Sequence, residues 1–247
     1  MQIKQYIDST YLKTQEESGL TFDAHHEAVL SVAREAIAEG FKLVMIRPDK
    51  VQAVKKILQE NNTNLLIGTV VSFPEGIHSI SEKLEEAEFA IQAGADELDF
   101  VANYTAFKNG ELELVKEEIF KGTQLALTNN KVVKWIIEVA ALSDAQIIQF
   151  SALIKNVVLS NFKEEQYANV FVKSSTGFYK TENNLPNGAT FPAIVMMLEN
   201  SFPLSVKAAG GVRTYEEAVR MIKMGVKRIG TSSAKSIASG ANSNSDY

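Results

Sequence analysis

The clearest helical pattern in the chain spans residues 23–39. Its apolar side chains follow the spacing i, i+3, i+4, i+7, i+8, which places them on one face, and they are Val29, Val32, Ala33, Ala36 and Ile37. The opposite face is polar, as expected for a helix that covers a core on one side only. Asp23 is the predicted N-cap, and Gly40 is the predicted left-handed residue that ends the helix.

Three further helix starts are predicted by capping boxes, in which two side chains three positions apart satisfy each other's backbone N–H groups. The pairs are Ser79 with Glu82, Ser143 with Gln146 and Thr214 with Glu217. An amphipathic segment, a glycine and a short apolar run also follow one another around Gly40, Gly94 and Gly225. The chain therefore repeats a helix, a turn and a strand.

Seven short apolar runs predict buried parallel strands. They cover residues 42–46, 65–71, 97–101, 132–139, 169–173, 204–207 and 227–230. An eighth strand around residues 6–8 would complete a (β/α)8 barrel, whereas without it an open doubly wound sheet remains possible. Because the glycine fingerprint of dinucleotide-binding folds does not follow the first strand, we favour the α/β class and the (β/α)8 TIM barrel.

The composition is that of a single large domain. The chain has 247 residues, of which 45% are hydrophobic and 22% charged, enough for one domain of barrel size. We assign residues 1–238 to the barrel domain. Residues 239–247 are rich in glycine, serine and asparagine and are predicted to form a flexible C-terminal tail. Residues 183–188 are predicted to form a loop inside the domain rather than a linker.

Charge and composition exclude several classes of function. The net charge of −5 is spread along the chain without a basic run, which argues against a nucleic-acid partner. The chain has no cysteine, which excludes disulfides, thiolate catalysis and zinc–thiolate sites. The longest apolar run, residues 193–198, is too short to span a bilayer, and the N-terminus lacks the apolar stretch of a signal peptide. We expect a cytoplasmic protein without a membrane partner.

A metal site is not predicted. His25 and His26 are adjacent and project in different directions from a helix, and His78 is the only other histidine. Surface or capping roles explain these residues better than metal binding. A serine hydrolase is not predicted either, because no Gly-x-Ser-x-Gly elbow occurs.

Two lysines carry the strongest chemical signal. Lys173 and Lys207 lie 34 residues apart, each at the end of a short apolar run and each followed closely by glycine. A free lysine amine, with a pKa of about 10.4, attacks carbonyl groups poorly at neutral pH. Burial beside a second cation lowers that pKa, and a pKa of about 7 would leave roughly half of the amine uncharged. The alternative is two surface lysines whose stems lie along apolar neighbours.

Two carboxylates also lie at strand ends, where the active site of a (β/α)8 barrel is found. Alternation along residues 96–101 places Glu97 and Asp99 on one face. An inward Asp99 near the two lysines could transfer a proton, or it could serve as a salt-bridge partner of Lys207, and both roles can coexist. Asp8 has either a role in the site or a role as N-cap of the turn at Ser9 and Thr10.

Glycines near the C-terminus indicate a phosphate site. Gly210 and Gly211 precede the helix start at Thr214, and residues 230–233 (GTSS) follow the last strand. In barrels, the loops after strands seven and eight commonly bind phosphate, because exposed N–H groups and a helix N-terminus favour an anion. The alternative is that these glycines only form tight turns.

With these residues identified, the chain resembles the deoxyribose-phosphate aldolase family over nearly its whole length. The resemblance rests on residues 8–13 (DSTYLK), 69–76 (TVVSFPEG), 94–99 (GADELD), 172–178 (VKSSTGF) and 207–214 (KAAGGVRT). It implies a class I aldolase, a carbon–carbon lyase that reversibly cleaves 2-deoxy-D-ribose 5-phosphate to D-glyceraldehyde 3-phosphate and acetaldehyde. No cofactor is implied.

The resemblance also implies roles for individual residues. Lys173 matches the lysine that forms the Schiff base, Lys207 the lysine that perturbs it and takes part in proton transfer, and Asp99 the acid/base carboxylate. The residues assigned to substrate binding, mostly to the phosphate, are Asp8, Thr10, Gly177, Gly210, Gly211, Gly230, Ser232 and Ser233. A terminal tyrosine, here Tyr247, could reach over the site, or the tail could be inert.

Two departures from the family pattern leave the assigned chemistry intact. Ser9 stands where the family often has histidine, and residues 138–140 (EVA) replace a Glu-Thr-Gly sequence. The implied partners are small sugar phosphates and aldehydes, and we expect a homo-oligomer, either a dimer or a tetramer. Deoxyribonucleotide catabolism is the implied setting.

Two alternative functions remain. Another Schiff-base sugar-phosphate lyase or a transaldolase-like enzyme would keep the lysines and the phosphate loops but take a different substrate. A non-catalytic sugar-phosphate-binding protein would bind without turnover.

Overall fold

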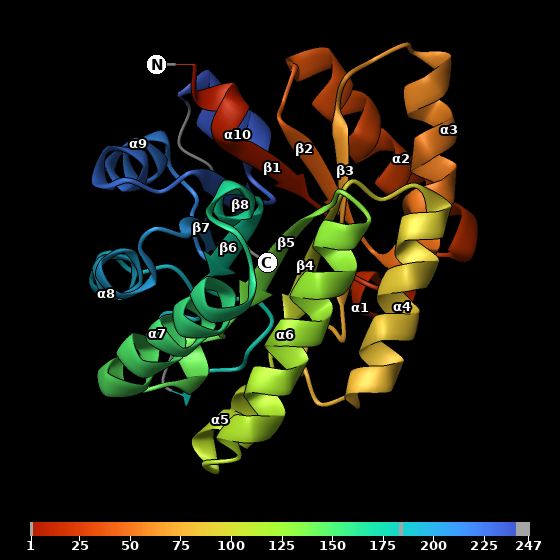
Figure 1. The fold of residues 1–247 in the computed structure, drawn as a ribbon. Helices are drawn as coiled ribbons and strands as arrows, with labels where there is room; N and C mark the ends of the chain where they lie inside the picture. The colour runs from red at the N-terminus through yellow and green to blue at the C-terminus, as the bar shows by residue number, and fades with distance from the viewer. Residues whose placement is uncertain (1, 183–184, 241–247) are drawn as a thin grey trace.

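Eight parallel strands, each hydrogen-bonded to the next, close into a barrel in the computed structural model, which describes residues 2–182 and 185–240 (Figure 1). The strands are β1 Ile7–Thr10, β2 Leu43–Ile46, β3 Leu66–Val71, β4 Glu97–Val101, β5 Val132–Ile136, β6 Val170–Lys173, β7 Ser205–Ala209 and β8 Arg228–Thr231. In β1, Asp8 is in register with Leu43 of β2 and with Gly230 of β8. The predicted eighth strand therefore exists, and it closes the sheet into the predicted (β/α)8 barrel rather than leaving it open.

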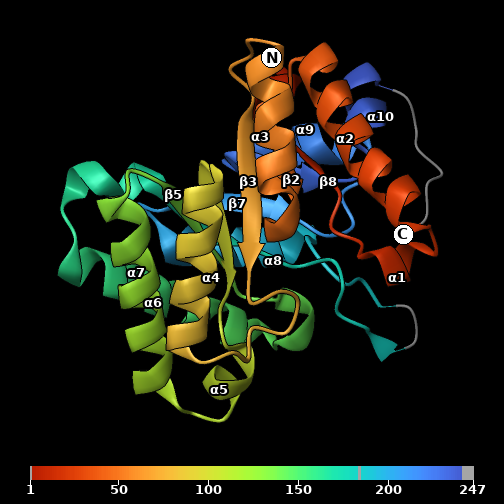
Figure 2. The same ribbon diagram turned by 90° about the vertical axis from the view of Figure 1, so that its right-hand side faces the viewer.

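Helices surround the barrel, as Figures 1 and 2 show. The α-helices are α1 Gln15–Ser18, α2 Phe22–Glu39, α3 Val51–Glu60, α4 Ile80–Ala93, α5 Tyr104–Lys108, α6 Leu112–Thr128, α7 Asp144–Asn161, α8 Phe191–Ser201, α9 Tyr215–Met224 and α10 Ala234–Ser239. The short 3-10 helices are η1 Ile3–Tyr6, η2 Pro48–Lys50, η3 Val139–Ala141 and η4 Glu164–Asn169. Within the described residues, no helix combines the length and the apolar composition that crossing a bilayer requires.

The structure confirms the helix ends predicted from the sequence, with one correction. All three predicted capping boxes are present, at the starts of α4, α7 and α9. Helix α2 ends at the left-handed Gly40 as predicted, but its N-cap is Thr21 rather than Asp23. The hydroxyl of Thr21 accepts the backbone N–H of Ala24, so the helix begins at Phe22 and Asp23 lies in its first turn. There its charge still favours the positive end of the helix dipole.

The fifth strand is shorter than predicted. It ends at Ile136, whereas the apolar run continues to Val139. Glu138 has a φ of 55°, in the left-handed region that breaks a strand, and η3 follows directly. The apolar pattern could not show this turn because Val139 is buried as well.

Strand residues point alternately toward the helices and into the barrel. On β5, Val133 and Trp135 belong to the core between sheet and helices, whereas Lys134 and Ile136 point inward. An inward apolar cluster consists of Leu12, Leu43, Met45, Val70, Phe73, Val101 and Ile136. Several other inward side chains are charged, and these belong to the site described below.

The predicted tail falls almost entirely outside the described residues. Helix α10 ends at Ser239, and Gly240 follows it in the left-handed conformation. Residues 241–247, with Tyr247, are not described, so the division into a domain of residues 1–238 and a tail of residues 239–247 stays a prediction.

Candidate active site

A cluster of buried charges lies inside the barrel. We call it the interior cluster, and its members are Asp8, Glu97, Asp99, Lys134, Lys173, Lys207 and Arg228. No member has more than 5% of its surface exposed. They come from β1, β4, β5, β6, β7 and β8, at positions that the alternation of each strand turns inward.

Asp99 lies at the centre of this cluster. Its Oδ1 accepts from Lys134 at 2.7 Å, and its Oδ2 accepts from Lys173 at 2.9 Å and from Lys207 at 2.8 Å. Burial tends to raise the pKa of Asp99, but Lys134, Lys173 and Lys207 outweigh it and hold the pKa well below its usual range. Asp99 is therefore ionised. It lies close to Lys173 and Lys207, as proton transfer would require, and it also forms the predicted salt bridge with Lys207.

Asp8 also belongs to the interior cluster. Its Oδ2 lies 2.6 Å from Nζ of Lys207, and its Oδ1 accepts from Nε of Arg228 at 2.7 Å. Although burial raises the pKa of Asp8, the charges of Arg228 and Lys207 lower it further than that. The alternative role of Asp8 as an N-cap is wrong, because its carboxylate pairs with these buried cations instead.

Lys173 differs from the other cations of the cluster in its partners. Lys134 pairs with Glu97 and Asp99, Lys207 with Asp8 and Asp99, and Arg228 with Asp8 and Glu97. Among the residues that the structure describes, Lys173 forms an ion pair with Asp99 alone. Since the described cluster holds four cations and three carboxylates, loss of one proton balances its charge. Lys173 is the cation that loses the least attraction by giving it up.

The pKa of Lys173 follows from this arrangement. Burial, followed by the charge of Lys207, lowers it to about 8, although Asp99 acts in the opposite direction. About one tenth of the amine is then uncharged at neutral pH, many times more than for a free lysine. The predicted direction is confirmed, but burial contributes more than the second lysine. The surface-lysine alternative is wrong for both residues, which are 3% and 1% exposed.

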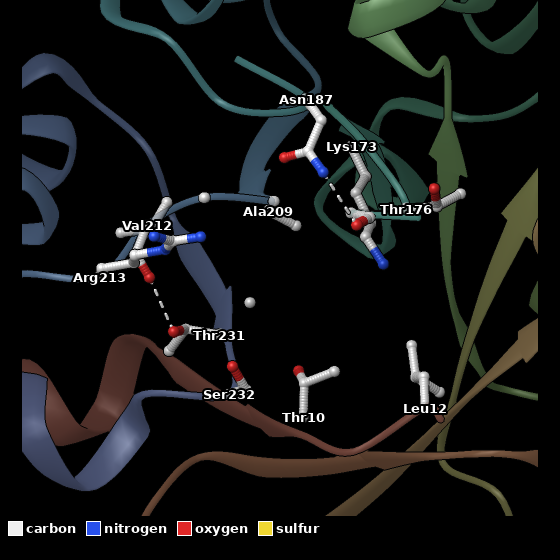
Figure 3. Close-up of a pocket in the computed structure, with 14 residues that line it drawn as sticks. Thr10, Leu12, Lys173, Thr176, Asn187, Ala209, Val212, Arg213, Thr231 and Ser232 are labelled. Atoms are coloured by element: carbon white, nitrogen blue, oxygen red, sulfur yellow. Dashed lines mark hydrogen bonds between the residues drawn. The ribbon is translucent and has the colours of Figure 1, made fainter. Parts of the chain in front are cut away.

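A pocket opens above the cluster and reaches Lys173 (Figure 3). Of the residues assigned to the site, those that line it are Thr10, Lys173, Gly177, Gly210, Gly211, Gly230 and Ser232. Asp8, Asp99 and Lys207 are not in the lining but contact one another behind Lys173. Ser233 is not in the lining either, and its backbone N–H donates to Oγ1 of Thr231.

The glycines of the pocket have two kinds of role. Gly177, Gly210 and Gly211 have φ values of 82°, 83° and 76°, which glycine adopts without strain. Gly230 instead provides space, since a Cβ there would lie 3.0 Å from Cε of Lys207. Gly230 thus lines the pocket and also makes room for a lysine of the interior cluster.

The start of α9 is partly occupied by its own side chain. The backbone N–H groups of Arg213 and Thr214 both donate to Glu217, so neither is free for an anion. The side chains of Arg213 and Ser232 lie together on one side of the pocket in Figure 3 and offer polar groups there. We therefore expect a phosphate to bind at the pocket loops and Arg213 rather than at the start of α9.

Several residues of the site were not singled out by the sequence. Lys134 and Arg228 complete the interior cluster, and Arg213 and Asn187 line the pocket. Lys134 had a visible signal, a lysine inside the apolar run 132–136, whereas Arg228 stands at the start of a strand where a polar residue is common. Nδ2 of Asn187 donates to the carbonyl oxygen of Gly177 at 3.2 Å and so ties two walls of the pocket together.

Glu138 orders the loop that follows Lys173. It is 1% exposed, and its Oε2 accepts from the backbone N–H of Thr176 at 3.0 Å and from the Thr176 hydroxyl. Burial raises the pKa of Glu138 despite these hydrogen bonds. Because Thr176 lines the pocket, the departure from the family pattern at Val139 and Ala140 directly follows a residue that shapes the site.

Among the described residues, no group of three or more histidine, aspartate or glutamate side chains is placed to bind a metal ion. His25 is 5% exposed, and its Nε2 lies 2.9 Å from the carbonyl oxygen of Lys13. His25 is therefore buried and contacts a loop carbonyl, so the surface or capping role expected from the sequence is wrong for this residue.

Comparison with known proteins gives a consistent result. No family model matches the chain. The chain is 36% identical over 241 residues to the deoxyribose-phosphate aldolase of Thermococcus kodakarensis, with 97% of each chain covered. It is also 36% identical to the deoxyribose-phosphate aldolase of Streptococcus pneumoniae, with 100% of each covered. Among solved structures, the tetrameric deoxyribose phosphate aldolase from Aeropyrum pernix is similar with a TM-score of 0.77 and 27% identity, covering 96% of this chain and 89% of that one.

Proposed function

The chain belongs to the deoxyribose-phosphate aldolase family, and from this premise we propose that it cleaves 2-deoxy-D-ribose 5-phosphate reversibly to D-glyceraldehyde 3-phosphate and acetaldehyde through a Schiff base on Lys173. The enzyme is thus an aldolase that acts without a cofactor. One observation carries the proposal: Lys173 lines the pocket, pairs with a single carboxylate in the part of the chain that the structure describes, and has a pKa lowered to about 8.

The first step is attack by the uncharged amine of Lys173 on the aldehyde carbon C1 of the open-chain sugar. Uptake of one proton and loss of water leave an iminium ion, which withdraws electrons from the neighbouring carbons. Acetaldehyde contains C1 and C2, so the bond that breaks is C2–C3. Its electrons move into the iminium and form an enamine, while the C3 hydroxyl loses its proton and becomes the aldehyde of glyceraldehyde 3-phosphate. Protonation of the enamine at C2 and hydrolysis then release acetaldehyde.

The interior cluster is suited to these proton transfers. The iminium restores the positive charge that Lys173 gave up as the free amine, so the cluster then holds the same charge as with protonated Lys173. When C2–C3 breaks, the iminium charge disappears and the C3 hydroxyl proton can take its place. Asp99 and Lys207, 2.8 Å apart behind Lys173, are the groups we assign to this transfer, together with an ordered water.

The loops on the far side of the pocket position the substrate. We assign the 5-phosphate to the segment around Gly210 and Gly211, with Arg213 and Ser232 beside it. Holding the phosphate there fixes C1 near the Lys173 amine, which replaces a bimolecular encounter by an oriented one. Thr10, also in the lining, is assigned to the sugar hydroxyls.

Borohydride reduction in the presence of acetaldehyde tests the Schiff base. We expect a stable adduct on the peptide that contains Lys173, identified by mass analysis, and no adduct in Lys173→Met. The matched control is Lys116→Met, because Lys116 is a surface residue that pairs with Glu113. An adduct on any other lysine, or none, would refute the mechanism.

A substrate panel separates the alternatives. Turnover of 2-deoxy-D-ribose 5-phosphate in preference to ketose phosphates and 2-keto-3-deoxy sugar phosphates supports the proposed reaction. Preference for one of the others would instead assign the same site to a different Schiff-base lyase or to a transaldolase-like enzyme. Binding of the sugar phosphate without turnover would indicate a non-catalytic protein.

The assembly and setting of the enzyme are proposals as well. The relative from Aeropyrum pernix is a tetramer, and for this chain we propose a homo-oligomer, either a dimer or a tetramer. Analytical ultracentrifugation would measure the oligomeric state. A cytoplasmic location and a role in deoxyribonucleotide catabolism stay predictions.

A further inference from the structure

Arg47 lies outside the pocket lining but connects three loops around the pocket. It directly follows β2 and precedes Pro48, with a φ of −69° and a ψ of 153°. A residue before proline is restricted to extended conformations of this kind. The backbone therefore cannot continue into a helix at Arg47.

The guanidinium group of Arg47 joins the loop after β1 to the loop after β3. Its Nε donates to the carbonyl oxygen of Leu12 at 2.7 Å, and its Nη1 donates to that of Phe73 at 3.3 Å. Its Nη2 lies 3.7 Å from Oε2 of Glu17. The guanidinium carbon lies 4.8 Å from the centre of the Phe73 ring. A planar fork of donors can make these contacts at once, whereas a lysine ammonium cannot.

Phe73 extends the connection to the loop after β6. Its ring packs edge-on against that of Phe178, with 5.0 Å between the ring centres and an angle of 78°. The backbone N–H of Phe178 donates to Oγ1 of Thr176, which lines the pocket, as does the adjacent Gly177. Arg47 is thus linked through Phe73 to the loop that follows Lys173.

Of the described residues that Arg47 contacts, Leu12 is the one that lines the pocket. Its side chain is 2% exposed, lines the pocket and belongs to the inward apolar cluster with Met45 and Phe73. Figure 3 shows Leu12 on the same side of the pocket as the Lys173 amine, whereas Arg213 and Ser232 lie across from it. With the phosphate on the far side, the carbons bound to Lys173 lie on the side of Leu12.

We propose that Arg47 is a positioning residue that holds Leu12 as the apolar wall for the donor aldehyde, the two carbons that Lys173 carries. The inference rests on the proposed function, because it takes Lys173 as the point of attachment. Without Arg47, the carbonyl of Leu12 loses its charged donor and the segment from Leu12 to Glu17 loses its link to Phe73. The wall then recedes, and a donor aldehyde with one more carbon fits.

The test compares acetaldehyde with propanal as donors for D-glyceraldehyde 3-phosphate in wild type, Arg47→Met and Arg47→Lys. One methylene in an apolar pocket is worth about 10- to 200-fold in kcat/KM, so we expect the preference for acetaldehyde to fall about tenfold in both variants. The matched control is Arg34→Met, whose guanidinium pairs with Glu27 on the exposed surface. The preference for D-glyceraldehyde 3-phosphate over D-glyceraldehyde should stay unchanged, because the phosphate lies across the pocket.

Leu12→Ala provides a second route to the same result if the Arg47 variants fold poorly. It removes the wall directly and should lower the preference for acetaldehyde in a similar way. If Arg47 acts through Leu12, the double variant Leu12→Ala/Arg47→Met should be no less selective than Leu12→Ala alone.

The outcomes separate this inference from the proposed function. Wild type is measured first, and failure to cleave 2-deoxy-D-ribose 5-phosphate or to form the Lys173 adduct would refute the proposed function. If wild type passes, an unchanged ratio of the two donors in Arg47→Met and Arg47→Lys overturns the role of Arg47, whatever their thermal stability. A strictly additive double variant overturns it too.

Discussion

Lys173 and Lys207 donate to the same oxygen, Oδ2 of Asp99, at 2.9 and 2.8 Å. The two lysines are in register on neighbouring strands, so their ammonium groups are held side by side with one carboxylate between them. The shared carboxylate reduces the repulsion but does not remove it. The charge of Lys207 still lowers the pKa of Lys173.

The first prediction concerns pH. Because the pKa of Lys173 is about 8, the uncharged amine becomes scarcer as pH falls below that value. The rate of adduct formation with acetaldehyde should rise about tenfold per pH unit below the pKa and level off above it. Single-turnover trapping at a series of pH values measures this. A rate that does not change between about pH 6 and about pH 9 would contradict the assignment.

The second prediction concerns Lys207. In Lys207→Met, the pKa of Lys173 should rise, because a neighbouring cation is lost and Asp99 and Asp8 keep their charges. The midpoint of the trapping rate should move to higher pH, and turnover at neutral pH should fall. Lys207→Arg keeps the charge and is the matched control, so its midpoint should stay near that of wild type. Equal midpoints in all three proteins would exclude an electrostatic role for Lys207.

The third prediction separates Schiff-base formation from cleavage. Asp99 raises the pKa of Lys173, so Asp99→Asn should lower it and leave more amine uncharged. We expect acetaldehyde to remain trappable on Lys173 while turnover falls about 10²- to 10⁴-fold, the usual contribution of general acid–base catalysis. Parallel trapping and turnover assays measure both steps.

Asp99→Asn should also lose stability, by about 3–5 kcal/mol, because buried ammonium groups lose their shared partner. Urea denaturation measures the free energy of unfolding. Full turnover in a variant that folds would remove Asp99 from the proton transfer.

The fourth prediction uses two glycines that line the same pocket. A Cβ at position 230 would lie 3.0 Å from Cε of Lys207 and 3.1 Å from Cβ of Ala209, so Gly230→Ala should displace Lys207 and lower kcat by about tenfold or more. At Gly211 a Cβ meets nothing within 4 Å, but its φ is 76°. Gly211→Ala should therefore cost about 1 kcal/mol of stability and raise KM rather than lower kcat. Steady-state kinetics distinguish the two, and identical effects would contradict the separate roles.

The fifth prediction concerns Glu138. Glu138→Gln keeps an oxygen that can accept from Thr176 and should be close to wild type. Glu138→Gly relieves the left-handed φ of 55° but removes both hydrogen bonds to Thr176. Since hydrogen bonds to a charged group contribute about 1.5–3 kcal/mol each, we expect KM for the sugar phosphate to rise about tenfold. If Glu138→Gly keeps the wild-type KM, the loop after Lys173 does not need Glu138 for its ordered conformation.

Most of the barrel could be predicted because parallel strands are buried on both faces and appear as apolar runs. The runs predicted seven strands whose ends lie within three residues of the observed ends. The eighth, β1, is short and was predicted from a weak signal. The error at β5 arose at Glu138, where a left-handed turn follows the strand without any glycine or proline to mark it.

The charged residues of the site could be predicted where a polar residue closes an apolar run. Lys173, Lys207 and Asp99 met that test, and the structure brings them together. Arg47 did not, since an arginine between a strand and a proline is ordinary in sequence. Its contacts with Leu12 and Phe73 depend on loops 35 and 26 residues away.

The sequence by itself determined the (β/α)8 fold and the kind of chemistry, because hydrophobic periodicity and residue type at strand ends are local properties. The family resemblance matched Lys173 to the Schiff-base lysine, but only the tertiary structure gives a physical reason that separates it from Lys134 and Lys207, which are buried beside it on neighbouring strands. The distinction lies in how many carboxylates each ammonium can reach, and those carboxylates come from β1 and β4, far away in the chain. A pKa depends on distances across the barrel, and no local pattern records them.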